Sequence, residues 1–150
     1  VRTSFIVGHP NETQEMFDEM CEFAATFGFD RMNIFSYSDE ETTSAYDMEN
    51  KISNEIKAER AQILGDIASE ATRKSLQGEI GKTLDIVIDG ESDEHEYLLS
   101  ARELIWAPEI DGEIYVNDRV KDEDLVFKKT YKAKITDLVG NILTATVDNA

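Results

Sequence analysis

The sequence predicts two structural parts: an incomplete α/β unit over residues 1–77, and an all-β, antiparallel five-stranded barrel over residues 78–150. Three observations support this fold class. The apolar periodicity changes from about 3.6 residues to 2 residues near residue 77. The first part opens with a short continuous apolar run, which is typical of a parallel strand buried on both faces. The second part holds about five short alternating segments separated by turn signals, the pattern of a small closed barrel.

The first part is expected to form a strand, a helix and a second strand. Residues 3–7 form the apolar run, which ends at Gly8. Asn11 and Gln14 have the spacing of a capping box, which predicts a helix start, and Gly28 suits the position just after its end. The expected apolar stripe of this helix is Met16, Met20, Phe23 and Phe27. Residues 32–37 then predict a strand parallel to the first.

A long helix follows a polar loop over residues 38–50. Its apolar residues recur at intervals of three, four and seven, and the helix should end near Gln77 and Gly78. The stripe comprises Ile52, Ile56, Ile63, Leu64, Ile67, Ala68 and Ala71.

Five segments of the second part alternate apolar and polar residues, at about residues 80–88, 97–101, 114–116, 126–138 and 142–147. Asp89-Gly90, Asp111-Gly112 and Gly140-Asn141 are turn signals between them, and the last predicts a two-residue hairpin.

Two parallel strands do not make a complete sheet, because such a sheet is covered on both faces and usually has several strands. We therefore expect the chain to be the C-terminal piece of a longer protein. The alternative is a small α+β domain whose sheet has only two strands.

Charge is the strongest compositional signal. The 150 residues contain 32 acidic and 15 basic side chains, a formal net charge of −17. This charge opposes binding to a phosphate backbone and favours a basic protein partner. An acidic surface that only maintains solubility is the alternative. No segment has the pattern of a membrane span or a signal peptide, so we expect a cytoplasmic protein without membrane contact.

Side chains suited to catalysis are few, and the residues alone predict no catalytic group and no metal site. His9 follows the first strand, where α/β enzymes place ligands, but a turn histidine is the simpler interpretation. His95 lies in an acidic turn. Cys21, the single cysteine, is expected in or beside the core rather than as a nucleophile. No phosphate-binding or nucleophile-elbow motif is present.

Two segments resemble a known family. Residues 4–13 (SFIVGHPNET) resemble the strand and turn "FIVGFPGET" of the radical-SAM methylthiotransferases, with His9 and Asn11 replacing Phe and Gly. Residues 34–38 (IFSYS) resemble the next barrel strand of that family, and residues 42–45 fall where it often has Gly-Thr-x-Ala. The helix that carries Arg60 and Leu64 resembles the linker into the family's C-terminal barrel.

Residues 101–116 resemble the "GR…DAPEVDG.VYV" signature of that C-terminal barrel, the OB-like TRAM domain, in the branch that modifies ribosomal protein S-twelve. Ala101 replaces the usual Gly, and Trp106 replaces the Asp before Ala-Pro-Glu. The resemblance covers nearly the whole chain in the correct order. It implies residues 1–77 as the end of a radical-SAM α/β barrel with its linker helix, and residues 78–150 as the TRAM domain.

The resemblance implies a full-length enzyme that uses S-adenosylmethionine and two 4Fe-4S clusters to methylthiolate an aspartate of ribosomal protein S-twelve. The cluster-binding CxxxCxxC motif is absent from this chain, so we expect the chain alone to be inactive and to bind none of these cofactors. By analogy with the family, the residues on the S-adenosylmethionine side are Ser4, Ile6, Gly8 and Glu12.

Charge favours the ribosomal-protein branch. Residues 76–150 contain 17 acidic and 8 basic side chains, so the barrel is expected to dock the basic protein substrate through Arg102, Glu109 and Asp111. A tRNA methylthiotransferase of the same superfamily is the first alternative, because Lys128, Lys129, Lys132 and Lys134 cluster in sequence and would suit RNA. A stand-alone acidic interaction module is the second.

Overall fold

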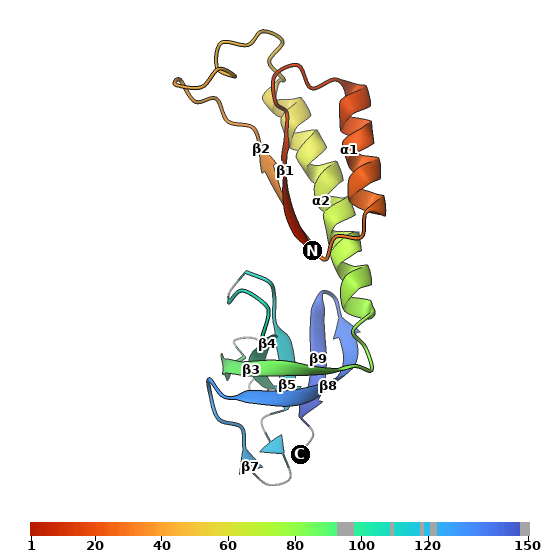
Figure 1. Ribbon diagram of the computed structural model, residues 1–150, viewed down its shortest axis with the longest axis vertical. Helices are drawn as coiled ribbons and strands as arrows, with labels where there is room; N and C mark the ends of the chain where they lie inside the picture. The colour runs from red at the N-terminus through yellow and green to blue at the C-terminus, as the bar shows by residue number, and fades with distance from the viewer. Residues whose placement is uncertain (93–97, 109, 118, 121–122, 148–150) are drawn as a thin grey trace. The chain divides into compact units, whose positions relative to one another are not determined.

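The computed structural model describes residues 1–92, 98–108, 110–117, 119–120 and 123–147, and divides the chain into two compact units, Val1–Ser75 and Leu76–Ala150 (Figure 1). The division lies close to the predicted change of periodicity. Each unit has its own apolar cluster and is described separately below. Within the described residues, neither helix combines the length and apolarity needed to cross a membrane.

Unit 1 is a two-stranded parallel sheet with two helices on one face (Figure 1). Its elements are β1 (Arg2–Val7), α1 (Gln14–Thr26), β2 (Arg31–Ser36) and α2 (Asn54–Gln77). The strands pair in register from Arg2↔Arg31 to Val7↔Ser36. Burial alternates along β1, with Thr3, Phe5 and Val7 the less exposed residues. One face therefore packs against the helices, and the other carries Ile6 and Phe35, which are 57% and 53% exposed.

Both helices contact this sheet through a narrower stripe than the periodicity predicts. On α1 the buried residues are Phe17 and Ala24, with Met20 and Cys21 packed beside them. Met16, Phe23 and Phe27 are about half exposed, at 57%, 49% and 54%. The predicted stripe was therefore wrong by about one residue in register. On the part of α2 that lies in unit 1, the buried apolar residues are Leu64 and Ala68, whereas Ile56 and Ile63 are each 42% exposed.

The start of α1 also differs from the capping-box prediction. Thr13 is the N-cap, and its hydroxyl accepts a hydrogen bond from the Met16 amide at 3.2 Å. Asn11 lies outside the helix at a φ of 68° and exchanges hydrogen bonds with Asn50. The predicted helix end is confirmed, because Phe27 is the C-cap and Gly28 follows it at a φ of 86°.

Unit 2 is a closed five-stranded barrel, as predicted. Its strands are β3 (Thr83–Glu91), β4 (Leu98–Glu103), β5 (Ile114–Asn117), β8 (Thr130–Val139) and β9 (Ile142–Val147), in the order β3-β4-β5-β9-β8. Two short strands, β6 (Arg119–Val120) and β7 (Glu123–Asp124), pair separately. The pairs are antiparallel except β5 with β9, which is parallel. The barrel is therefore mixed rather than wholly antiparallel.

Alternate side chains of these strands fill the barrel. Ile86 and Ile88 of β3 point inward, as do Ile135 of β8 and Leu143 of β9, and all four are completely buried. A register shift between Ile88 and Gly90 bends β3 and leaves Asp89 unpaired with β4. The Gly140-Asn141 turn joins β8 to β9 as the predicted two-residue hairpin.

Candidate functional site

The sequence points to two candidate sites, one in each unit. The first is the end of β1 in unit 1, where the resemblance places Gly8 and Glu12. The second is the outer surface of the barrel around Arg102 in unit 2.

The turn after β1 is held by Gly8 and Glu12. Gly8 has a φ of 79°, a conformation that side chains with a Cβ rarely adopt. Its amide donates to Oε2 of Glu12 at 3.0 Å, and the Glu12 amide donates to the His9 carbonyl at 3.0 Å. A Cβ on Gly8 would lie only 2.4 Å from Cγ of Lys57. The turn is therefore closed both by backbone conformation and by close packing.

Glu12 is also one half of a buried ion pair with Arg60 of α2. Nη1 of Arg60 lies 2.6 Å from Oε1 of Glu12, and both side chains are only 8% exposed. The same nitrogen donates to the Glu12 carbonyl at 3.1 Å, and the guanidinium lies over the Phe17 ring at 5.2 Å. Glu12 thus connects the end of β1 to both helices, and its carboxylate is already engaged.

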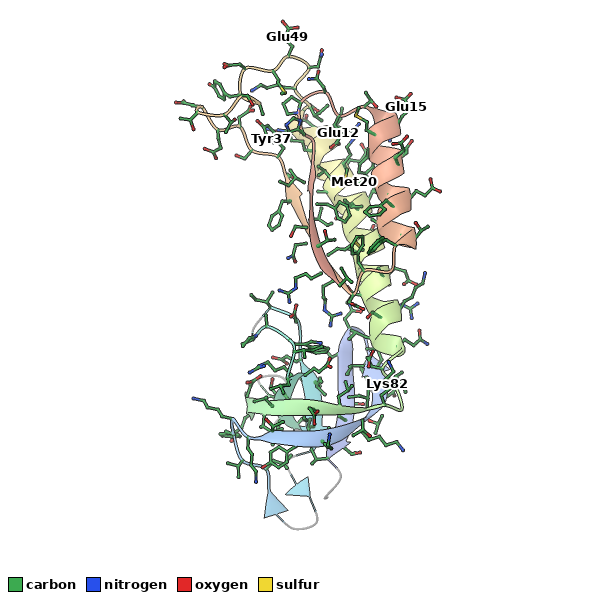
Figure 2. The ribbon with its side chains drawn as sticks, viewed as in Figure 1. Glu12, Glu15, Met20, Tyr37, Glu49 and Lys82 are labelled. Carbon is green, nitrogen blue, oxygen red and sulfur yellow. The ribbon has the colours of Figure 1, made fainter. Side chains whose placement is uncertain are left out.

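Three further side chains meet at this strand end. Nζ of Lys57 donates to the Tyr37 carbonyl at 3.1 Å and lies 5.2 Å from the centre of the Tyr37 ring. The His9 ring meets the same tyrosine edge-on at 5.2 Å. Figure 2 shows Glu12 and Tyr37 at the same end of the two strands. His9 therefore packs against Tyr37, whereas the sequence alone predicted only that it lies in a turn.

Ser4 and Ile6 lie on the sheet face opposite the helices. The parallel register places Ser4 beside Asn33 and Ile6 beside Phe35. This face thus presents two polar residues followed by two apolar ones towards the end that carries Gly8. The structure brings Gly8 and Glu12 into contact, and it sets Ser4 and Ile6 together on the adjoining open face.

Lys57 and Arg60 are the functional-site neighbours that sequence reasoning missed. They lie three residues apart in the first half of α2, so helical periodicity places them on one side of the helix. That pattern alone does not indicate which side faces the β1 turn. A buried arginine beside a buried glutamate is a tertiary pairing, which no local signal reports.

Cys21 packs beside the core of unit 1, and its surroundings make the thiol unreactive. Burial raises the pKa of its thiol, and the nearby Asp18 and Glu12 carboxylates raise it further. A raised pKa keeps the thiol protonated and poorly nucleophilic. The predicted role as a core or boundary residue agrees with this placement.

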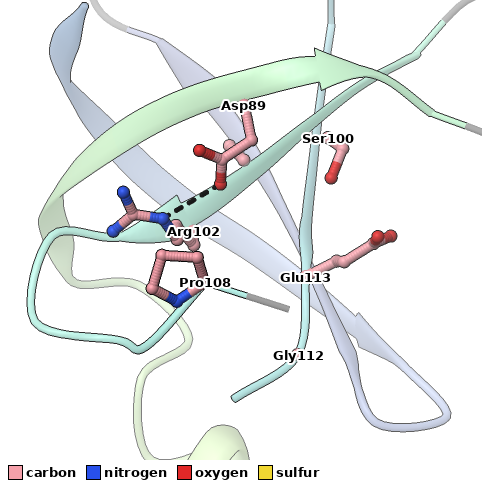
Figure 3. Close-up of a pocket in the computed structure, with 7 residues that line it drawn as sticks. Asp89, Ser100, Arg102, Pro108, Gly112 and Glu113 are labelled. Atoms are coloured by element: carbon pink, nitrogen blue, oxygen red, sulfur yellow. Dashed lines mark ion pairs between the residues drawn. The ribbon is translucent and has the colours of Figure 1, made fainter. Parts of the chain in front are cut away.

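The second candidate site is a pocket of about 330 Å³ on the outer face of the barrel (Figure 3). Its lining residues are Asp89, Ser100, Ala101, Arg102, Pro108, Gly112 and Glu113. Nε of Arg102 forms an ion pair with Oδ2 of Asp89 at 3.1 Å, and Nη1 donates to the Trp106 carbonyl at 3.2 Å. Arg102 therefore fastens the loop after β4 to the bulge of β3.

Asp111 has a structural place in the same loop. The residue is 8% exposed, and its Oδ2 accepts a hydrogen bond from the Ala107 amide at 2.7 Å. Arg102 lines the pocket, whereas Asp111 braces the loop that follows β4. Glu109, the third residue predicted for substrate docking, lies outside the described residues, as do His95 and the acidic turn around it.

One of the two lysines of β8 lies in an ion pair. Nζ of Lys132 lies 3.0 Å from Oδ1 of Asp85, on the neighbouring strand β3. Nζ of Lys129 lies 5.4 Å from the centre of the Tyr131 ring. Lys132 and Lys134 point outward on the same face. The described part of the chain contains no group of three or more histidine, cysteine or acidic side chains arranged to hold a metal ion.

Comparison with known proteins identifies both parts of the chain. Residues 80–147 match the TRAM domain family. The whole chain is 64% identical to the "Ribosomal protein uS12 methylthiotransferase RimO" of Sulfurimonas denitrificans and covers 34% of that protein. Over 98% of the chain, identity is 54% to the protein of the same name from Aliarcobacter butzleri and 56% to that from a Sulfurovum species, each covered over 33% of its length.

The chain thus spans about a third of the length of the curated relatives that it matches. The match runs through the β1 turn, the long helix and the barrel in one alignment. The motifs quoted from the sequence and the closed barrel agree with it. Over its whole length the chain is thus similar to a part of the RimO proteins, and its residues 80–147 match the TRAM domain, which agrees with a C-terminal fragment of such a protein.

Proposed function

We propose that this chain is the C-terminal portion of a radical-SAM enzyme that methylthiolates an aspartate of ribosomal protein uS12, and that its barrel docks that substrate. The observation that carries the proposal is the charge of the barrel half, with 17 acidic and 8 basic side chains. A ribosomal protein is basic, so this surface attracts it and repels nucleic acid. The pairing of Lys132 with Asp85 supports the same partner, because it removes one cation from the face that RNA would use.

The pocket around Arg102 is the proposed docking surface. Arg102 shapes it by holding the loop after β4, and Asp111 keeps that loop closed from inside. Glu109 lies in the same loop sequence and is proposed to contact the substrate directly. The predicted docking residues thus divide into residues that build the surface and a residue that contacts the partner.

The end of β1 is proposed to contribute to the S-adenosylmethionine side of the full-length barrel. Ser4 and Ile6 present a hydroxyl and an apolar surface on the open face, while Gly8 lets the chain turn after β1 with Lys57 packed against it. Glu12 acts indirectly, by fixing the turn through Arg60. In the full-length protein, S-adenosylmethionine and two 4Fe-4S clusters supply the radical chemistry.

The iron–sulfur clusters do not fit the residues of this chain. Each cluster needs several cysteine thiolates, whereas the sequence has one cysteine, packed beside the core of unit 1. We therefore propose that the ligands lie elsewhere in the full-length protein and that this chain alone does not catalyse the reaction.

A parallel titration tests the docking proposal. The chain is titrated with ribosomal protein uS12 and, separately, with tRNA, each at low and at moderate salt. We expect binding to uS12 that weakens as salt rises, and no comparable binding to tRNA. Salt-sensitive binding to tRNA alone would overturn the proposal in favour of the tRNA-modifying branch. Binding to neither would leave the barrel without the proposed role.

A further inference from the structure

The pocket on the barrel holds a carboxylate that the fold does not use. In β4, Leu99 and Ala101 point into the barrel, so Ser100 and Arg102 point outward. The pairing Ala101↔Ile114 sets the next residues, Arg102 and Glu113, opposite each other at the start of β5. Opposite charges at such positions normally pair. Here Arg102 turns instead toward Asp89 (Figure 3).

Glu113 is left exposed, with no hydrogen bond or ion pair to any residue that the structure describes. The two contacts that the structure gives Arg102 are instead with the Asp89 carboxylate and the Trp106 carbonyl. Nε of Arg102 lies 3.1 Å from Oδ2 of Asp89, but its N–H does not point at that oxygen well enough to form a hydrogen bond. Among the described residues, the pocket therefore contains two carboxylates, one of them uncompensated, and one guanidinium, which pairs with the other carboxylate.

We propose that this pocket receives a lysine or arginine side chain from the basic protein partner, with Glu113 as its counter-charge. The Ser100 hydroxyl and the free oxygen of Asp89 are further acceptors on the wall, and the Pro108 ring offers an apolar surface for the aliphatic stem of the side chain. A volume of about 330 Å³ is at the lower end of the range for ligand pockets, which suits a single side chain.

An anionic ligand is disfavoured at the same place. It would meet two carboxylates, and the positive charge of Arg102 beside them is already paired with Asp89. A cation gains charge-assisted hydrogen bonds without breaking a contact that is already made. The inference deepens the proposed function, on which it rests for the nature of the partner, by assigning one pocket and one residue to the contact.

A small probe tests the pocket independently of the ribosomal protein. Nα-acetyl-arginine amide is titrated into the isotope-labelled chain and followed by nuclear magnetic resonance. We expect saturable shifts centred on the backbone amides of Ser100, Ala101, Gly112 and Glu113. The uncharged citrulline counterpart should give none. The Glu113→Gln variant should bind the arginine probe about tenfold more weakly, the loss expected for one charge-assisted hydrogen bond.

Asp137→Asn is the matched control. Asp137 is an exposed carboxylate on β8, outside the pocket, and its Oδ1 accepts from the Leu138 amide at 2.8 Å, a bond that the asparagine oxygen can keep. This variant changes the net charge by the same amount and should bind the probe as the original chain does. Equal weakening in both variants would show a general charge effect and would overturn the pocket.

The same variants separate this inference from the docking proposal. If uS12 binds the chain and Glu113→Gln leaves its affinity unchanged, the pocket assignment is overturned while docking stands. If the arginine probe binds in the pocket but uS12 does not bind, docking fails and the cation pocket is supported. Probe shifts spread over other acidic residues would also contradict the pocket.

Discussion

At the scale of single residues, the strand-end site depends most on the buried ion pair between Glu12 and Arg60. Replacing Glu12 by Gln leaves the Arg60 guanidinium buried without a counter-charge, and it weakens the hold on the Gly8 amide. We expect the free energy of unfolding of unit 1 to fall by about 3 kcal/mol or more. Chemical denaturation measures this change.

Glu70→Gln is the control for that variant. Glu70 pairs with Arg73 on α2, and both side chains are nearly half exposed, at 47% and 46%. Exposed pairs contribute little to stability, because water screens them. A loss in Glu12→Gln no larger than in Glu70→Gln would show that the buried pair does not anchor the turn.

Two features disfavour a side chain at Gly8: its positive φ and its close contact with Lys57. Gly28 has the positive φ alone, so comparing the two glycines separates the two costs. Gly8→Ala meets both the cost of a φ of 79° and the contact with Lys57, whereas an added Cβ at Gly28, with a φ of 86°, meets no atom within 4 Å. We expect Gly28→Ala to cost about 1 kcal/mol and Gly8→Ala to cost clearly more in thermal unfolding. Equal costs would exclude a steric contribution from Lys57.

The raised pKa of Cys21 predicts the pH dependence of its alkylation. The thiolate is the reactive form, and burial together with Asp18 and Glu12 disfavours it. The alkylation rate of the folded chain should therefore rise at a higher pH than that of the chain unfolded in urea. The single cysteine makes the readout site-specific. Coincident pH profiles would contradict the described surroundings of this thiol.

Residue-level prediction succeeded where the signal is local. Gly8 was singled out because it ends an apolar run, and the structure gives it a positive φ. Arg102 was identified from a motif and lies on a pocket wall. Arg60 was noticed only as part of a linker motif, because its partner Glu12 lies 48 residues away. Long-range ion pairs leave no periodic trace in a sequence.

At the scale of elements, the N-cap of α1 gives a direct test. Thr13→Ala removes the oxygen that accepts from the Met16 amide, and a lost N-cap costs about 1 kcal/mol. Hydrogen exchange should show faster exchange at Met16, and Thr13→Ser should restore protection. If Asn11 were the cap instead, Thr13→Ala would leave this exchange unchanged.

Periodicity predicted which helices and strands exist and in what order. It did not predict which side of each helix is buried. Alternation identified the barrel strands, because inward residues such as Ile86 and Ile88 recur every second position. The helix stripes were predicted too broadly, since apolar residues such as Met16 and Ile63 lie at the edge of the packed face. The parallel pairing of β5 with β9 depends on how the barrel closes, which is a property of the whole unit.

At the scale of the whole molecule, the net charge of −17 is the feature on which the proposed choice of partner rests. Acidic and basic side chains are distributed over both halves, so the charge is not that of a tail. Its long-range field speeds encounter with a basic protein and is screened over about 10 Å at 0.1 M salt. In the proposed function, contacts in the barrel pocket then determine where the partner is held.

The most direct test of the central claim is a footprint of ribosomal protein uS12 on the chain by hydrogen exchange. We predict protection on the outer face of β3, β4 and the start of β5, around Arg102 and Glu113, at low salt. Protection confined to β8 and its lysines, or to unit 1 alone, would contradict the assignment of the barrel pocket as the docking surface.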